Sequence, residues 1–308
     1  MRIGIVTPAF NVAGYIGRTI QSVLAQTHRD WVMTIVDDGS TDATAAIAGA
    51  FDDHRLRIIR QPNAGVSAAR TRGLTATGAD AILFLDGDDW LSQDALAVLA
   101  EALDANPDAV AAVGSYTRVP GARRVRQPAS GDLLETLLVR NLFANGGHLL
   151  IRRAALDAAG LFNTGLRYGE DWEYWIRLAS FGPFAAARSR APLLFVRERH
   201  DGAYLDMAAR PESFSPCMAA IFDAPTLKAR LGASAVARLR RRAEAENDWI
   251  VGRELIRHGL PLDGRHFLLR SVRAAPGLRR LALLAAACIP FRGIGPFRRY
   301  PSPENAPL

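Results

Sequence analysis

The stretch LFLDGDDW, Leu83–Trp90, changes abruptly from an apolar run to a cluster of carboxylates. Asp86, Asp88 and Asp89 are separated only by a glycine, and negative charges this close repel one another. A buried strand end is a poor place to solvate them. We therefore predict a strand over Ala81–Leu85 that ends at a site where something offsets the repulsion.

Earlier runs share the short, apolar character of Ala81–Leu85 and lie at similar intervals along the chain. They are Ile3–Thr7, Trp31–Val36 and Leu56–Arg60. Runs that are apolar on both faces are typical of parallel strands in a covered sheet, and helical spacing lies between them, as in Ile16–Leu24. The alternation predicts an α/β fold: a Rossmann-like, mostly parallel sheet flanked by helices, with ligands at the carboxyl ends of the strands.

The alternation is less regular after Asp89. The next expected elements are a helix capped by Ser92 with Leu96, Leu99, Ala100 and Leu103 on its inner face, strands over Ala109–Tyr116 and His148–Ile151, a helix ending at Gly160, and a strand over Pro192–Val196. Trp172 and Trp175, at helical spacing, could stack on a sugar but are better explained as core residues of a further helix. From about Ala203 the pattern is helical and rich in arginine, which predicts a C-terminal appendage over residues 203–308.

The positive charge of the chain is concentrated in this appendage. The formal net charge is +7, and Arg238–Tyr300 holds 14 arginines against five acids, so the rest of the chain is slightly acidic. Arginines also flank the apolar segment Leu281–Phe291. That composition fits peripheral contact with an anionic membrane, an apolar helix docked on the rest of the protein, or a solvated basic face. No nucleic-acid partner is expected.

The cysteine content and the absence of long apolar runs bear on the compartment. Cys217 and Cys288 cannot build a disulfide framework, which favours a reducing setting. No run of eighteen apolar residues occurs, and the start MRIGIVTPAFN is too polar for a signal peptide. The sequence therefore predicts a cytoplasmic protein, with any membrane contact peripheral and at the inner face.

Each of the four predicted strands is followed directly by polar or turn residues. The segments are TPAFN, DDGSTD, QPNAG and DGDD. Because the carboxyl ends of parallel strands share one edge of a sheet, these segments should converge. Turn chemistry alone could explain any one of them, including DDGSTD with Asp37 and Asp38, but four in register favour a ligand site.

Asp86 and Asp88 lie two residues apart, so both can reach one hard divalent cation. Mg²⁺ or Mn²⁺ would offset the repulsion among the carboxylates. Two carboxylates leave most of an octahedral shell open for substrate phosphates and water. A structural Ca²⁺ loop is the rival interpretation, but the EF-hand spacing is absent.

Motifs along the chain occur in an order that resembles the family 2 glycosyltransferases, which have the GT-A fold. They are IVTPAFN, VDDGSTD, QPNAGVSAARTRGL, LFLDGDDW and GEDWEYWIRLA. The resemblance implies a GT-A catalytic domain over residues 1–202. It also implies an inverting, metal-dependent, hexosyltransferase-like enzyme whose donor is a nucleotide-diphospho-sugar, usually a UDP-sugar. No Q-x-x-R-W signature of processive synthases is present, so transfer of a single sugar is expected.

The resemblance assigns a substrate site to residues that follow the strands. Phe10 would pack on the base, Asp38 would accept a hydrogen bond from uracil N3–H, and Arg70 would steady the crevice or the diphosphate. Asp86 and Asp88, the DxD pair, would hold the ribose and the metal. The implied substrate-binding residues are Pro8, Ala9, Phe10, Asp38, Asn63, Gly65, Arg70, Asp86, Glu170 and His200.

The resemblance makes Asp171, the second acid of the last motif, the general base. It should open a helix, whose N-terminus favours an ionised carboxylate, so we expect Asp171 to be charged at neutral pH. The alternative is that Asp171 merely caps the helix, and Glu170 competes for the role of base. His200 would lie near the diphosphate, although a lone histidine is more often structural or simply exposed.

Two other functions stay open on sequence grounds. A nucleotidyltransferase also joins an α/β sheet to paired aspartates, but no Gly-rich phosphate loop follows the first strand. A non-catalytic nucleotide-sugar-binding protein would need only a degenerate site. We favour sugar transfer to the hydroxyl of a saccharide or lipid-linked acceptor, in cell-envelope polysaccharide or glycolipid assembly.

Overall fold

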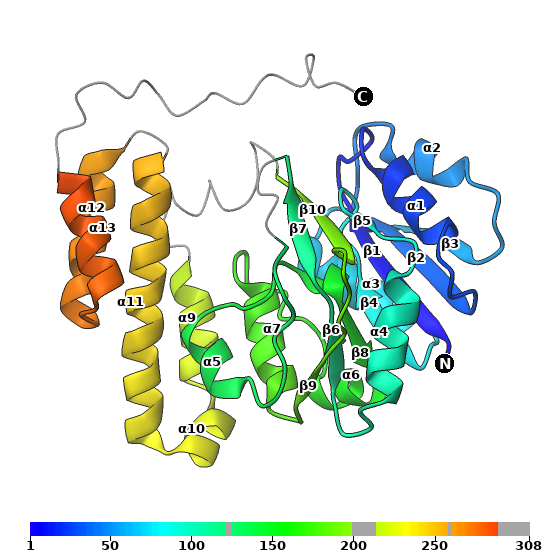
Figure 1. The fold of residues 1–308 in the computed structure, drawn as a ribbon. Coiled ribbons are helices and arrows are strands. Elements are labelled where there is room, and N and C mark those ends of the chain that lie inside the picture. Colours follow the sequence, from blue (N-terminus) through cyan, green and yellow to red (C-terminus); the bar gives the residue numbers. More distant parts are fainter. Residues whose placement is uncertain (121–124, 199–213, 258–259, 289–308) are drawn as a thin grey trace. The chain divides into compact units, whose positions relative to one another are not determined.

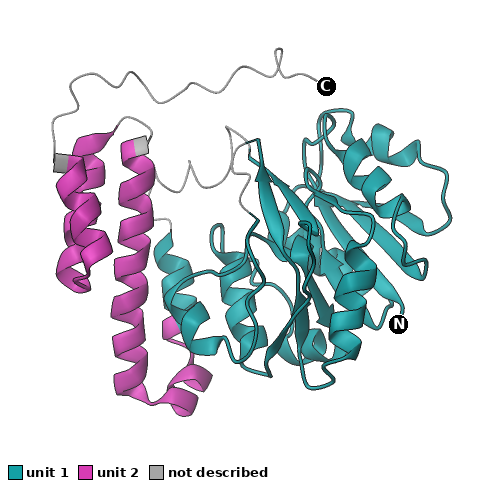
Figure 2. Ribbon diagram, viewed as in Figure 1, with its two compact units in different colours: residues 1–202, 214–221 teal, residues 203–213, 222–308 magenta. Residues whose placement is uncertain are grey.

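The computed structural model describes residues 1–120, 125–198, 214–257 and 260–288. The chain forms two compact units (Figure 2). The first contains residues 1–202 and 214–221, and the second contains residues 203–213 and 222–308. Among the helices that the structure describes, none combines the length and the apolar character needed to cross a membrane.

A seven-stranded sheet forms the centre of the first unit (Figure 1). Its strand order is β3 (Leu56–Arg60), β2 (Trp31–Asp37), β1 (Ile3–Ala9), β4 (Ala81–Phe84), β8 (Leu149–Arg152), β6 (Ala111–Val113) and β9 (Phe184–Ala186). β1 to β4 run parallel to one another, whereas β8 is antiparallel to both β4 and β6. The predicted α/β fold with four parallel strands is confirmed.

Helices cover both faces of the parallel strands. Those of the first unit are α1 (Ile16–Leu24), α2 (Thr44–Gly49), α3 (Val66–Ala76), α4 (Ala95–Asp104), α5 (Leu134–Val139), η1 (a 3-10 turn, Gly146–His148), α6 (Arg153–Ala159), α7 (Glu170–Ala179) and most of α9 (Ser215–Phe222). α1 and α4 share one core with Ile5, Met33 and Leu83. Gly73 of α3 lies directly against Val6 on the other face, where a side chain would collide. Side chains on both faces of these strands therefore meet apolar partners. This is why the strand sequences are apolar on both faces and not only at alternate positions.

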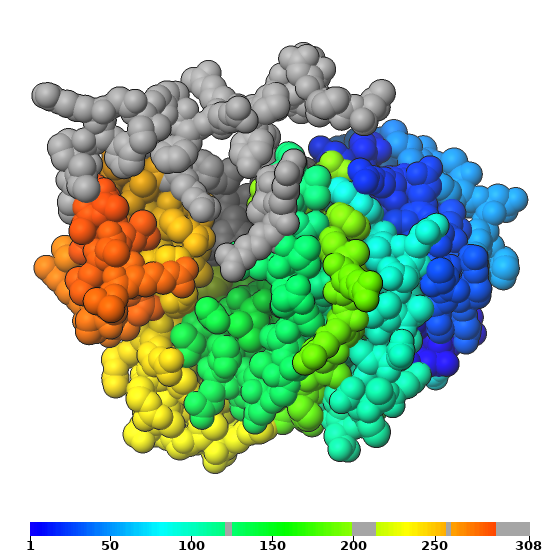
Figure 3. Space-filling view, in the orientation of Figure 1, coloured from blue at the N-terminus to red at the C-terminus, as the bar shows by residue number. Residues whose placement is uncertain are grey.

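A second sheet holds the strands that the first sheet leaves out. Its order is β5 (Trp90–Leu91), β10 (Leu194–Arg197) and β7 (Tyr116–Val119). The prediction of one continuous strand over Ala109–Tyr116 is wrong, because the chain leaves the first sheet after Val113. Buried Ser115 lies between β6 and β7, and its carbonyl accepts hydrogen bonds from the start of β10. The segment leading to β10, yellow-green in Figure 3, lies at the surface beside the cyan chain of α4.

Of the helix boundaries predicted at Gly160 and at Ser92, the one at Gly160 is confirmed and the one at Ser92 is wrong. Gly160 follows α6 with φ of +78°, as expected for a glycine at the end of a helix. Ser92 does not cap α4, because the helix begins at Ala95 after Asp94, and the Ser92 hydroxyl donates to the Asp94 carboxylate at 2.7 Å. The inner face predicted for α4 is nevertheless buried.

The second unit is helical, as predicted. Its described helices are α10 (Pro225–Leu231), α11 (Ala233–Arg257), α12 (Pro261–Ala274) and α13 (Leu278–Cys288). α11 and α12 approach each other at two glycines, since a Cβ on Gly252 would lie 2.7 Å from the carbonyl oxygen of Gly264. The predicted apolar segment Leu281–Phe291 lies partly in α13 and partly outside the described residues.

Candidate active site

The carboxyl ends of the parallel strands lie side by side. Ala9 of β1 is in register with Asp37 of β2, and β4 pairs with the other edge of β1. The loop after β4 returns toward β1: a Cβ placed on Gly87 of this loop would lie 3.2 Å from the carbonyl oxygen of Pro8 in β1. TPAFN, DDGSTD and DGDD therefore converge in the structure.

Asp38 is buried and bound by donors of the protein itself. Its Oδ1 accepts hydrogen bonds from Gln61 Nε2 at 2.7 Å and from Ala64 N at 2.9 Å, and its Oδ2 accepts one from Gly65 N at 2.8 Å. These bonds hold the Asn63–Gly65 turn against the end of β2. Asp38 thus anchors this turn and keeps acceptor capacity on Oδ2.

The other residues predicted at the base pocket differ in exposure. Ala9 is buried and Pro8 is half-buried, whereas the Phe10 side chain is 46% exposed and so open to a stacking partner. Asn63 is exposed, and Gly65, at φ of +88°, precedes the first residue of α3. Phe10, Asn63 and Gly65 are therefore accessible to a ligand, whereas Ala9 is not.

A hollow of about 260 Å³ lies between the first turn of α3 and the loop that leads to α7. It is lined by Ala64, Gly65, Val66, Ser67, Thr164, Gly165, Leu166 and Arg167. The turn anchored by Asp38 forms one wall. The hollow is therefore a place where part of a bulky substrate could enter the site.

Two of the three carboxylates of DGDD, those of Asp86 and Asp89, have different surroundings. Asp86 pairs with Nη2 of Arg70 at 2.9 Å. Asp89 is buried and accepts hydrogen bonds from Asn145 Nδ2 at 2.6 Å and from the backbone N–H of Arg197 at 2.8 Å. Burial, and then the charges of the neighbouring carboxylates, raise the pKa of Asp89 well above its ordinary value. Arg70 therefore offsets part of the repulsion expected from the sequence, and the two donors to Asp89 hold its carboxyl group in place.

Asp86 and Asp88 are the residues that could hold a divalent cation. Both are partly exposed, and carboxylate oxygens are ligands that Mg²⁺ and Mn²⁺ prefer. Within the part of the chain that the structure describes, no group of three or more His, Cys, Asp or Glu side chains forms a metal site. The pair fits an open site, whose other ligands would come from a diphosphate and water.

Arg70 joins segments of the site that are far apart in the sequence. It is buried in α3, and besides its pair with Asp86 its Nη1 donates to Glu170 Oε1 at 3.0 Å. Burial lowers the pKa of Arg70, but the carboxylates Asp86, Glu170 and Asp171 outweigh that effect and raise it. Arg70 therefore stays charged and fixes the start of α7 against the DGDD loop.

Asp171 lies in the first turn of α7 but is not its cap. The residue before the helix is Gly169, at φ of +74°, so the alternative in which Asp171 merely caps the helix is wrong. Asp171 Oδ1 accepts a hydrogen bond from Trp172 N at 2.6 Å, and Asn141 Nδ2 lies 3.4 Å from Oδ2. Asn141 thus helps to orient the carboxyl group.

The surroundings of Asp171 oppose its ionisation more strongly than its place at a helix N-terminus indicates. Burial, and then the charge of Glu170, raise the pKa of Asp171 to about 7, although Arg70 lowers it. The stabilisation of an anion by the helix N-terminus does not outweigh these effects. A carboxyl group whose pKa is near neutral is well suited to accept a proton from a substrate.

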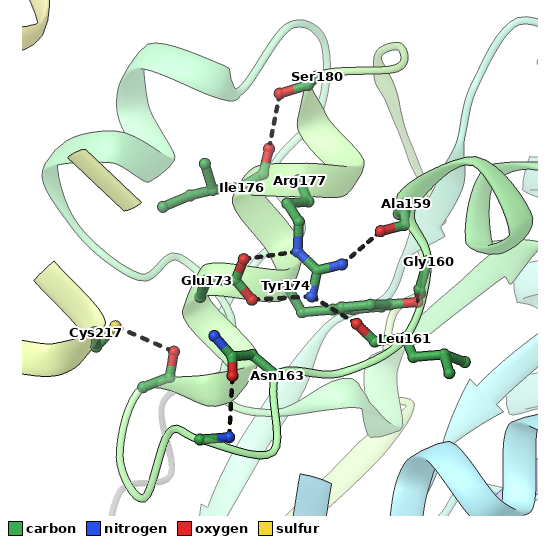
Figure 4. Close-up of polar contacts among 12 residues, drawn as sticks. Ala159, Gly160, Leu161, Asn163, Glu173, Tyr174, Ile176, Arg177, Ser180 and Cys217 are labelled. Atoms are coloured by element: carbon green, nitrogen blue, oxygen red, sulfur yellow. Dashed lines mark hydrogen bonds and ion pairs between the residues drawn. The ribbon is translucent and has the colours of Figure 1, made fainter. Parts of the chain in front are cut away.

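Polar contacts on the far side of α7 hold this helix in place (Figure 4). Arg177 pairs with Glu173, one turn earlier, at 2.6 Å, and donates to the carbonyl oxygen of Ala159. The hydroxyl of Tyr174 donates to the carbonyl oxygen of Gly160 at 2.8 Å. The end of α6 is thereby tied to the helix that carries the Glu-Asp pair.

Trp172 and Trp175 are core residues, as predicted, with 5% and 0% of their surface exposed. The ring of Trp172 stacks on that of Phe214 at 5.7 Å, and Cys217 Sγ donates to the carbonyl oxygen of Gly169 at 3.3 Å (Figure 4). Residues 214–221 therefore pack beneath the start of α7.

Asn145 and Arg197 are site residues that the sequence did not predict. Asn145 binds the buried Asp89, and Arg197 donates from Nε to the carbonyl oxygen of Asp88 at 3.2 Å. In the sequence, the only indication of a role for either residue is that it lies near a predicted strand. Many surface residues lie near strands, so this indication is weak. His200, predicted near the diphosphate, lies outside the described residues.

Known proteins match the N-terminal part of the chain. The succinoglycan biosynthesis protein ExoU of Rhizobium meliloti is 35% identical over 198 residues, which are 58% of this chain and 57% of ExoU. The uncharacterized glycosyltransferase EpsJ of Bacillus subtilis is 31% identical over 183 residues, which are 55% of this chain and 53% of EpsJ. Glycosyltransferase GlyA of Streptococcus pneumoniae is 38% identical over 117 residues, 37% of this chain and 17% of GlyA. The chain thus spans little more than half of these relatives, or less.

Solved structures match the fold over most of the chain. TarS 1-349 of S. aureus in complex with UDP-GlcNAc has a TM-score of 0.69 and 18% identity, covering 92% of this chain and 84% of that one. The mannosyltransferase PcManGT from Pyrobaculum calidifontis in complex with GDP-Man and Mn²⁺ has a TM-score of 0.57 and 20% identity, covering 92% and 79%. The predicted GT-A fold is thereby confirmed.

The sequence profile of "Glycosyl transferase family 2" matches residues 4–158, half of the chain. This segment contains β1 to β4, the anchored turn at Asp38, Arg70 and the DGDD loop. It holds four of the five motifs that carry the resemblance, and the fifth, GEDWEYWIRLA, follows it. The chain belongs to glycosyl transferase family 2.

Proposed function

We propose that this protein is an inverting glycosyltransferase that moves one sugar from a UDP-sugar to the hydroxyl of a saccharide or lipid-linked acceptor. The observation that carries the proposal is Arg70, which binds Asp86 of the DxD pair and Glu170 beside Asp171. Arg70 thereby joins two parts of one site. The pair Asp86 and Asp88 is suited to bind a sugar donor, and Asp171 is suited to act as a base.

In the proposed reaction, Asp171 takes the proton of the acceptor hydroxyl while that oxygen attacks the anomeric carbon and the bond to the diphosphate breaks. Attack opposite the leaving group inverts the configuration. Asp171 suits this role because its pKa of about 7 leaves a large ionised fraction at neutral pH. Asp86 and Asp88 would hold Mg²⁺ or Mn²⁺, which would neutralise charge on the departing diphosphate.

The choice of a nucleotide-sugar donor is supported by the structural neighbours. The TarS structure contains UDP-GlcNAc, and the PcManGT structure contains GDP-Man and Mn²⁺. We favour uridine, with the base on the exposed ring of Phe10 and its N3–H donated to Oδ2 of Asp38. Pro8, Asn63 and Gly65 would complete the base pocket.

We assign catalysis to residues 1–202 and a helical, accessory role to residues 203–308. The name of ExoU supports a place in polysaccharide assembly, and the acceptor would be met in the cytoplasm at the inner face of the membrane. In the second unit Leu278 is 88% exposed and Leu281 is 47% exposed, next to Arg279. That composition suits peripheral contact with a membrane interface.

The test is incubation with a panel of nucleotide sugars, with release of nucleotide and transfer of sugar followed by mass spectrometry. We expect turnover of a UDP-sugar that is lost in EDTA and in Asp88→Ala, but kept in Asp108→Ala, a change at an exposed acid. Full turnover in EDTA would exclude the metal. Transfer of a nucleotide would indicate a nucleotidyltransferase, and tight binding without turnover a non-catalytic protein.

A further inference from the structure

Arginines from distant parts of the chain meet on one tryptophan. The guanidinium carbon of Arg18, in α1, lies 3.6 Å from the ring centroid of Trp90, and that of Arg197, at the end of β10, lies 5.1 Å from it. Arg197 also lies 4.6 Å from the ring of Tyr15, and the ring of Phe195 stacks on Trp90 at 5.3 Å. We name these five residues the Trp90 cluster.

The arginines of the Trp90 cluster are not in ion pairs in the part of the chain that the structure describes. Among the described residues, no carboxylate forms an ion pair with Arg18 or Arg197: the Nε of Arg197 binds the carbonyl of Asp88, and Glu198 pairs with Arg118. Burial, and then the charge of Arg197, lower the pKa of Arg18. A cation–π contact explains one guanidinium on a ring. A second guanidinium adds repulsion that a bound anion would remove.

The Trp90 cluster borders the DGDD loop at the end opposite Arg70. Arg70 binds the first carboxylate of the loop. At the last residues of the loop, the carbonyl of Asp88 accepts a hydrogen bond from Arg197 at 3.2 Å, and the carbonyl of Asp89 accepts one from Thr19 of α1 at 2.7 Å. An anion on the Trp90 cluster would therefore lie next to the proposed donor site without using its carboxylates.

We propose that the Trp90 cluster is an acceptor subsite for an acidic saccharide. Arg18 and Arg197 bind a carboxylate or phosphate of the acceptor, and the partly exposed rings of Tyr15 and Phe195 contact its sugar. The guanidinium fork matches the geometry of both anions, and aromatic rings offer a large contact area at low conformational cost. The subsite rests on the proposed function, because it selects the acceptor of the same reaction.

The experiment is calorimetry on the full chain saturated with UDP and Mn²⁺, so that the donor site is filled. The probes are a hyaluronan tetrasaccharide, which carries carboxylates, glucose 6-phosphate, and neutral cellotetraose. We expect at least one acidic probe to bind about tenfold or more tightly than cellotetraose, as hydrogen bonds to charged groups allow. Added NaCl should weaken its binding.

The variants are Arg18→Gln and, as a matched control at an exposed arginine of β3, Arg57→Gln. Arg18→Gln should lose about tenfold in affinity for the acidic probe while its UDP affinity and thermal midpoint stay unchanged, and Arg57→Gln should behave as wild type. Equal binding by both variants, equal binding of acidic and neutral probes, or a parallel loss of UDP affinity in Arg18→Gln would overturn the subsite. If UDP does not bind wild type, the proposed function fails, and titration of the same probes without UDP still decides the subsite.

Discussion

Asp38 and Asp171 are acids of the same site, but the protein surrounds them with different groups. Asp38 accepts three hydrogen bonds from residues 61–65, which form the turn after β3, 23 to 27 positions later in the chain. Asp171 accepts one short hydrogen bond, from its neighbour Trp172, and a long one from Asn141, and otherwise lies near Glu170 and Arg70. Its pKa is raised to about 7.

The comparison indicates a structural role for Asp38 and a chemical role for Asp171. Donors of the turn at residues 61–65 bind the carboxylate of Asp38, so that Asp38 holds the backbone of the turn in place. Asp171 has too few donors for its burial, and its proton equilibrium is set by residues that come from other elements. Since both acids are buried, the number of hydrogen bonds that each carboxylate accepts is what distinguishes the structural acid from the proposed base.

Asp171→Asn should have the largest effect on activity. Asn cannot take the proton, so kcat should fall by about 10²–10⁴, the usual contribution of a positioned general base, while UDP affinity is kept. In wild type, kcat should rise with pH around the pKa of about 7, because the base must be ionised. A variant that keeps more than about a tenth of kcat at saturating substrates would move the base elsewhere, with Glu170 next to test.

The same variant should change the pH dependence of stability. The folded-state pKa of Asp171 is raised from 3.8 to about 7, so the folded protein binds this proton more tightly than the unfolded chain. Wild type therefore loses stability as pH rises from about 4 to about 7. Asp171→Asn should lose less over that window and be the more stable protein at pH above 7 in thermal unfolding. Parallel curves would contradict the raised pKa.

Arg70→Met tests the contact that joins the two carboxylate segments. It leaves Asp86 and Glu170 without their buried cation, so the free energy of unfolding should fall by about 3–5 kcal/mol. Urea unfolding at neutral pH measures it. The control is Arg72→Met, at an exposed position of the same helix, which should change stability by less than about 0.5 kcal/mol. Equal stability of the two variants would show that Arg70 is not needed to hold the cluster.

Asp38→Asn tests the acid that holds the turn at residues 61–65. One oxygen becomes an amide that faces backbone N–H donors, so the free energy of unfolding should fall by about 1.5–3 kcal/mol, with a loss of UDP affinity of similar size. Calorimetry below the thermal midpoint separates the two effects. Asp52→Asn, at an exposed acid, is the control. Loss of UDP affinity without loss of stability would mean that Asp38 serves the base and not the turn.

Tyr174→Phe should have the smallest effect. It removes only the hydrogen bond to the carbonyl of Gly160 and keeps the ring stacked on Phe162 at 3.9 Å. The free energy of unfolding should fall by about 0.5–1.5 kcal/mol, and kcat should be unchanged. A fall in kcat of tenfold or more would show that the α6–α7 contact sets the position of Asp171.

Much of the fold could be predicted because its signals are local. The apolar runs of β1 to β4 and the polar residues after each strand lie within a few positions of one another. The break between β6 and β7 could not be predicted, because Ser115 is held by β10, which comes much later in the chain. Ser92 failed as a helix cap for a similar reason, since its backbone N–H binds the carbonyl of Leu193.

The sequence by itself determined the four parallel strands, the convergence of their polar ends and the family, because hydrophobic period and turn residues are short-range properties. Only the tertiary structure decided which acids are buried, which pair with an arginine and which are placed to accept a proton. Arg70 and Glu170 are 100 positions apart, and Asp89 and Arg197 are 108 apart. Burial and charge at Asp171 depend on such pairs, and no local pattern records them.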